Sequence, residues 1–96
     1  MSKVRLCGVD IDVVFSDPED WEANGMGRSS QLNSRITIRK GMNEDLEGSV
    51  FLHEVIHLIS DMNNLNFCND ETHVSVLANS LNTFLRDNKL IYWKEK

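Results

Sequence analysis

The stretch that most constrains this chain is the apolar run VFLHEVIHLISD at residues 50–61, which carries His53, Glu54 and His57 in its middle. The run is apolar on nearly every side of the helix that it predicts, and such a helix is buried. Two imidazoles and a carboxylate in a buried helix need compensating partners, because burying an uncompensated polar group is costly. The chain must therefore fold so that it covers this helix and also satisfies three polar side chains.

The spacing of the two histidines indicates a metal. His53 and His57 are four residues apart, which places both imidazoles on one face of a helix, one turn apart. Two imidazole nitrogens in this arrangement can share one zinc ion, and the residues form an HExxH motif with Glu54 as the general base. The alternative is a pair of satisfied core histidines. The motif uses two of only three histidines in the chain, which favours zinc.

A catalytic zinc site also needs a third protein ligand and one open position. Three residues are candidates: Asp61, one turn beyond His57, and Glu71 and His73, at the start of a second predicted helix. A ligand from a second helix completes a tetrahedron better than a third ligand on the first, which favours Glu71 or His73. Each of the two also has an explanation without a metal. Glu71 would stabilise the first turn of its helix as an acidic residue, and His73 would be an exposed or substrate-binding residue. We expect Glu71 to be the third ligand, with the other two as alternatives.

Alternation of polar and apolar residues predicts β-structure in the first forty residues. Strands are expected over residues 3–7 and 9–15, and a hairpin or two adjacent short strands over 27–40, with a turn at Asn33-Ser34. The strand RITIRK, residues 35–40, is expected at a sheet edge where an extended substrate pairs its backbone. A cap before Pro18 predicts a short helix.

The period changes to that of a helix after Asn43. One helix is expected over about 44–61, and a second from Asn69 or Asp70 to about Asp87, joined by a loop over 62–70. The predicted core positions of the second helix are Val74, Leu77, Leu81, Phe84 and Leu85. The apolar tail at 90–93 is expected to cover the core or add a strand. The predicted fold is one α+β domain over 1–96: a small antiparallel or mixed sheet packed on two main helices, the first carrying HExxH.

Composition limits the classes of function. The net charge of -5 argues against a nucleic-acid surface, which needs clustered positive charge. We expect no membrane association, because no apolar run is long enough to span a bilayer. Cys7 and Cys68 form no CxxC pair, and the N-terminus has no signal-peptide pattern. The expected location is therefore the cytoplasm.

Three segments carry a resemblance to a known family: SRITIRKGM at 34–42, the HExxH run at 50–61, and NDETHVSVLANSLNTFL at 69–85. Together they resemble the ImmA/IrrE family of small metallopeptidases and related minimal gluzincins, and small phage-encoded members are the most similar in length. The resemblance implies a third ligand from a Glu at the start of the second helix, which corresponds to Glu71. Many members have His where Asp61 stands and an acid where His73 stands.

The resemblance and the motif predict a zinc-dependent metallopeptidase that acts on a protein or peptide substrate. By analogy with the family, this substrate is a phage or host regulatory protein, and the location is the cytoplasm of the host cell. The alternative is a non-catalytic binding module in which the metal only stabilises the fold. Glu54 distinguishes the two functions, because a structural metal site has no use for a general base and more often has four protein ligands.

Overall fold

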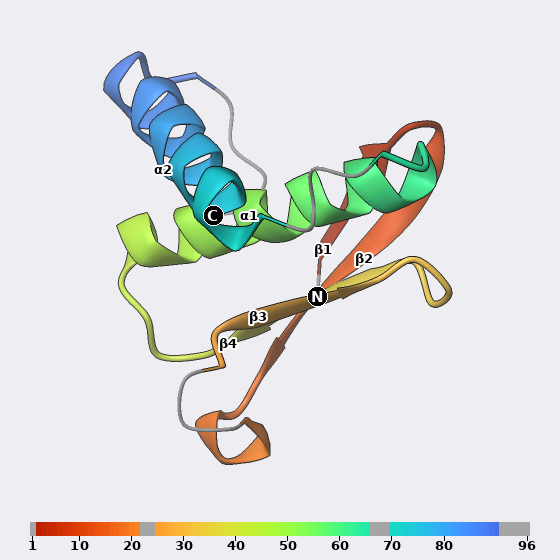
Figure 1. The fold of residues 1–96 in the computed structure, drawn as a ribbon. Coiled ribbons are helices and arrows are strands. Elements are labelled where there is room, and N and C mark those ends of the chain that lie inside the picture. The colour runs from red at the N-terminus through yellow and green to blue at the C-terminus, as the bar shows by residue number, and fades with distance from the viewer. Residues whose placement is uncertain (1, 22–24, 66–69, 91–96) are drawn as a thin grey trace.

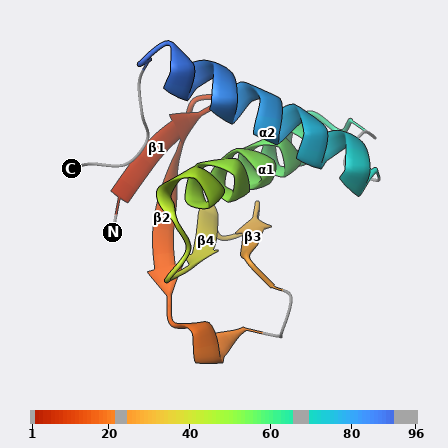
Figure 2. The same cartoon turned by 90° about the vertical axis from the view of Figure 1, so that its left-hand side faces the viewer.

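The computed structural model describes residues 2–21, 25–65 and 70–90. In this part of the chain, a mixed four-stranded sheet is covered on one face by a long helix, α1 (Glu44–Met62). A second helix, α2 (Glu71–Asp87), packs on the side of α1 that faces away from the sheet. Figure 1 shows α1 lying across the strands, and Figure 2 shows it between the sheet and α2. The predicted α+β class, with a mixed sheet and two main helices, is confirmed.

The sheet has the strand order β1-β2-β4-β3. Strands β1 (Ser2–Leu6) and β2 (Val9–Ser16) form an antiparallel hairpin, and β3 (Gly27–Ser30) and β4 (Arg35–Arg39) form another. Strand β4 joins the two hairpins by pairing in parallel with β2. The alternation seen in the sequence therefore predicted these strands and the hairpin of β3 and β4, but not the pairing of β1 with β2.

The predicted edge position of residues 35–40 is wrong, because β4 lies between β2 and β3. Ile36 and Ile38 are fully buried, together with Ile11 and Val13 of β2. β-branched residues buried beneath a helix suit a central strand. The edge strand on this side of the sheet is β3. It is short and polar, so its sequence predicted a strand less clearly than that of β4.

Both main helices begin close to the predicted residues, and each has a side-chain cap at its start. The Asn43 side chain accepts a hydrogen bond from the Leu46 backbone N–H at 2.8 Å, and the Asp70 side chain accepts from the backbone N–H groups of Thr72 and His73. Such caps satisfy backbone donors that the first turn leaves unpaired. The Asp70 cap fixes the start of α2, and with it the position of Glu71, the first residue of that helix.

The buried side of α2 agrees with the predicted core at Val74 and differs from it elsewhere. Val74, Ala78 and Asn82 are buried, while Leu77, Leu81 and Phe84 are exposed. The reason is that α2 packs on α1 and not on the sheet, so only a narrow face is covered.

Three other predictions reach parts of the chain beyond the described ranges. The helix expected after Pro18 is a single 3-10 turn, Pro18–Asp20, and residues 22–24 lie outside those ranges. So do 66–69 of the expected loop, which include Cys68, and 91–93 of the apolar tail. No helix among the described residues has the length and apolar character needed to cross a membrane.

Candidate metal centre

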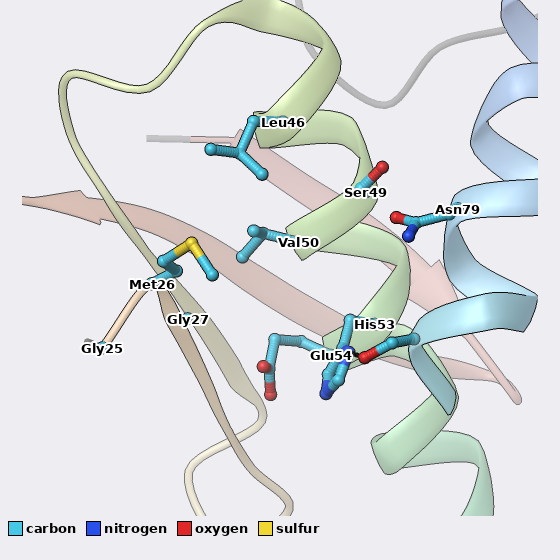
Figure 3. A pocket seen from close by; sticks show the side chains of 10 residues that line it. Gly25, Met26, Gly27, Leu46, Ser49, Val50, His53, Glu54 and Asn79 are labelled. Carbon is cyan, nitrogen blue, oxygen red and sulfur yellow. Dashed lines mark hydrogen bonds between the residues drawn. The ribbon is translucent and has the colours of Figure 1, made fainter. Parts of the chain in front are cut away.

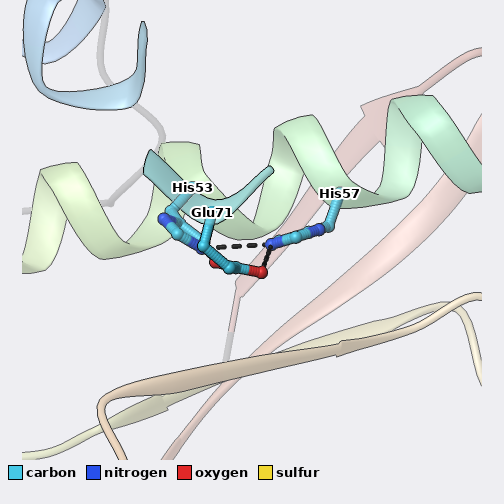
Figure 4. A group of neighbouring side chains, drawn as sticks. All are labelled: His53, His57 and Glu71. Carbon is cyan, nitrogen blue, oxygen red and sulfur yellow. Dashed lines mark hydrogen bonds and ion pairs between the residues drawn. The ribbon is translucent and has the colours of Figure 1, made fainter. Parts of the chain in front are cut away.

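Three predicted ligands come together where the start of α2 crosses the middle of α1. The Nε2 atoms of His53 and His57 are 3.1 Å apart. The two carboxylate oxygens of Glu71 lie 2.8 Å from Nε2 of His53 and 3.0 Å from Nε2 of His57. Figure 4 shows the Glu71 side chain reaching over α1 to both rings. One ligand atom from each residue therefore faces the same point in space.

The spacing of these atoms suits a small metal ion. Ligand atoms about 2.0–2.2 Å from a tetrahedral zinc ion lie about 3.3–3.6 Å from one another. The three candidate ligand atoms lie within 4.8 Å of one another, and the pairs above are at 2.8–3.1 Å. If these ligand atoms moved apart by a few tenths of an ångström, the distances between them would reach those of a zinc site. Two imidazoles with one carboxylate are also a donor set of catalytic zinc sites, which keep a fourth position open.

The two alternative third ligands lie outside this cluster. Nδ1 of His73 is 3.1 Å from the Asp70 carboxylate, and the His73 side chain is 80% exposed. Asp61 is exposed, and it is not part of the group of candidate ligands found within the described ranges. Of the three candidates, only Glu71 lies beside both histidines.

Ser75 contacts the ring of His53 from the opposite side. Its hydroxyl lies 3.4 Å from Nδ1 of His53, one turn of α2 after Glu71. A partner at one ring nitrogen orients the imidazole and leaves the other nitrogen for a metal. The sequence signal for Ser75 is its spacing of four from Glu71, which puts both residues on the same face of α2.

Glu54 lies beside the cluster but points toward the sheet. Its side chain is buried and accepts a hydrogen bond from the Ser29 hydroxyl on β3. Burial raises the pKa of the Glu54 carboxyl, and the hydrogen bond from Ser29 and the nearby histidines oppose this shift. A carboxylate with a raised pKa, held beside a candidate metal site, is suited to accept and return a proton.

Gly27 allows β3 to approach Glu54 closely. A Cβ atom at this position would lie 2.6 Å from Cγ1 of Val50 and 3.3 Å from a carboxylate oxygen of Glu54. Any larger residue would force β3 away from α1. Gly27 and Ser29 were not predicted as site residues. The sequence feature that could have indicated them is the alternation of side chains along a strand. It places Gly27 and Ser29 on the same face of β3, the face that α1 covers.

The backbone of β3 is oriented to receive another strand. The Arg39 N–H donates to the Met26 carbonyl at 2.9 Å. Since bonded and non-bonded pairs alternate in an antiparallel ladder, the next bonded pair is Arg28 with Thr37. The N–H and C=O groups of Gly27 and Ser29 therefore point away from β4, toward an edge of the sheet where no other strand of the described residues pairs.

Comparisons of the chain with models of known protein families, with curated proteins and with solved structures find no match. The interpretation of the site therefore depends on its own geometry and chemistry.

Proposed function

We propose that this protein is a zinc-dependent peptidase in which His53, His57 and Glu71 hold the metal and Glu54 is the general base. The proposal depends on one observation, namely that Nε2 of His53, Nε2 of His57 and the Glu71 carboxylate converge beside the buried carboxylate of Glu54. A zinc ion bound there would polarise a peptide carbonyl and lower the pKa of a water molecule to about 7.

The protein side chains would supply the remaining steps. Glu54 takes a proton from the attacking water and passes it to the amine that leaves when the peptide bond breaks. The Ser29 hydroxyl holds the Glu54 carboxylate in place. An extended substrate pairs with the outward backbone groups of Gly27 and Ser29, a recognition mode that uses main-chain hydrogen bonds. We place this activity in the cytoplasm, acting on a protein or peptide, and by family analogy on a phage or host regulatory protein.

Metal binding is tested first, because every later step requires it. Zinc titration of the metal-free protein should give one site per chain. Glu71→Ala should weaken binding by more than the roughly 10–100-fold typical of residues behind the ligands. His73→Ala and Asp61→Asn are matched controls that should keep wild-type affinity. Equal loss in His73→Ala and Glu71→Ala would contradict the assignment of the third ligand.

Catalysis is tested with a mixed peptide library, comparing the zinc-loaded wild type with Glu54→Gln. The amide has nearly the shape of the carboxylate but cannot accept the proton, so cleavage should fall by about 10²–10⁴-fold at unchanged metal content. Equal cleavage by both proteins would show that the activity comes from elsewhere.

A metal-stabilised binding module is the second candidate function. The observation that favours it is the row of exposed apolar side chains on α2, made of Leu77, Leu81 and Phe84. A binding role leaves the buried carboxylate of Glu54 without a purpose. Partner binding that persists in Glu54→Gln, with no cleavage by the wild type, would favour this function over the peptidase.

A further inference from the structure

A cavity of about 360 Å³ opens beside His53 and Glu54, toward the N-terminal half of α1. Figure 3 shows it between the approach to β3, where Met26 and Gly27 lie, and the α2 side, where Asn79 lies. Ligand pockets for small molecules begin at about 300 Å³. The cavity is therefore of a size for one side chain rather than for a long segment of a ligand.

The two sides of the cavity differ in chemistry. Met26, Leu46 and Val50 supply an apolar wall from the β3 approach and from α1. The opposite wall is polar and contains Ser49, Ser75 and Asn79. A side chain that enters between them contacts hydrocarbon along one side and hydroxyl and amide groups along the other.

Among the polar residues, Asn79 is the one most open to a ligand. The Ser75 hydroxyl contacts Nδ1 of His53 at 3.4 Å, and the Ser49 hydroxyl accepts a hydrogen bond from the Asn82 amide at 3.3 Å. Asn79 is exposed, whereas the two serines are half-buried. Its amide offers both a donor and an acceptor to a group in the cavity.

The charges around the cavity select against ionised side chains. The lining includes the carboxylate of Glu54 but no lysine or arginine. An acidic side chain would meet a like charge. A basic side chain would lie along the apolar wall, and the nearby carboxylate of Glu54 already accepts the Ser29 hydrogen bond and is the proposed base. Burying a charge without a partner is costly. An uncharged side chain fits both walls.

The position of the cavity relates it to the reacting bond. A peptide paired with the edge of β3 at Gly27 and Ser29 passes beside Glu54, and alternate side chains of an extended peptide point to the face that α1 covers. The cavity lies on that face, next to the proposed base. The side chain that enters it therefore belongs to a residue adjacent to the bond that is cut.

We propose that this cavity is the specificity subsite for a large uncharged side chain next to the scissile bond, with Val50 and Leu46 along its apolar part and Asn79 at its polar side. The proposal rests on the peptidase function argued above. It assigns Asn79, a residue outside the metal centre, as the residue that determines which side chains are accepted.

The test changes the charge at Asn79. The zinc-loaded wild type and Asn79→Asp are compared on peptides that differ at one position. The wild type should prefer uncharged side chains such as Leu, Met and Gln over Glu and Lys. The new carboxylate should raise the Lys-to-Leu ratio of kcat/KM about fivefold or more, a gain of the size of one partly screened ion pair. Ser80→Asp is the matched control, because Ser80 is an exposed residue of α2 that does not line the cavity.

A second measurement separates the subsite from catalysis. Zinc-chelating hydroxamates with a Leu, Lys or Glu side chain are titrated into the same zinc-loaded proteins. Wild type should bind the Leu compound most tightly, and Asn79→Asp should shift preference to the Lys compound. Cleavage with an unchanged profile in Asn79→Asp, or the same shift in Ser80→Asp, would overturn the subsite and leave the peptidase intact. No zinc binding, or neither cleavage nor hydroxamate binding by the wild type, would overturn both proposals.

Discussion

Removing the metal should loosen α2 before it affects the sheet. Two proposed ligands, His53 and His57, lie on α1, and the third, Glu71, is the first residue of α2. A shared metal therefore joins the two helices. The apolar contact that otherwise holds α2 is small, because Val74 and Ala78, each 1% exposed, are its buried apolar residues.

The size of the effect follows from these contacts. Burying a valine side chain contributes about 1.5–3 kcal/mol and a methyl group about 0.8 kcal/mol, so Val74 and Ala78 supply about 3 kcal/mol toward docking. A metal present at 100 times its Kd adds about 2.7 kcal/mol to the state that binds it. The metal would thus nearly double the docking free energy. Amides of α2 that exchange through undocking should slow by about 100-fold.

Hydrogen exchange read by mass spectrometry measures this directly. Peptides from α2 are compared in zinc and in chelator, with β2 and β4 as the internal reference. Glu71→Ala should remove the zinc effect on α2, and His73→Ala should retain it. If zinc binds but α2 exchanges at the same rate with and without it, the two helices are not joined through the metal and the reasoning fails.

Three further predictions concern Glu54 and the strand beside it. In metal-free protein, burial raises the folded-state pKa of Glu54, so the wild type should lose stability as the pH rises from the unfolded pKa of about 4.3 through the folded pKa. Glu54→Gln should therefore be the more stable protein at pH 7 in thermal melts. A stability difference between the two proteins that stays constant down to pH 4 would contradict this. Gly27→Ala should lower the free energy of unfolding by about 1–3 kcal/mol, measured in urea, because its Cβ would lie 2.6 Å from Cγ1 of Val50; wild-type stability would show that β3 shifts freely. Ser29→Ala should reduce kcat more than it raises KM while zinc affinity is kept, and Ser29→Thr should restore much of the lost kcat. A change in KM alone would assign Ser29 to substrate binding only.

The parts of the site that the sequence predicted are those set by helical geometry. The spacing of four between His53 and His57 and the onset of the helical period near Asp70 are local features, and they placed both histidines on one face and Glu71 at the start of α2. The choice between Glu71 and His73 needed the tertiary structure. The two residues lie two positions apart, and only the crossing of α2 over α1 directs one of them to the cluster.

The parts that the sequence left open depend on pairing between distant strands. Strands β2 and β4 are joined in parallel, and no local signal specifies this pairing. It moves β4 to the interior and gives the edge to β3, which is why RITIRK was assigned to the wrong position. The Ser29–Glu54 contact could not be predicted for the same reason. The core of α2 was overestimated because its apolar residues cover more of the helix than α1 can bury.

The two edges of the sheet differ in how they resist pairing with another chain. Strand β1 carries Lys3 and Arg5, which pair across the hairpin with Asp12 at 3.9 Å and Asp10 at 2.8 Å. Charged side chains, and lysine above all, discourage further strands from adding to an edge. Strand β3 has Gly27, Ser29 and Ser30 beside a single charged residue, Arg28, so its short length is the main feature that limits such addition. Self-association at high protein concentration should therefore begin at β3, so a peptide that occupies this edge would also keep the protein monomeric.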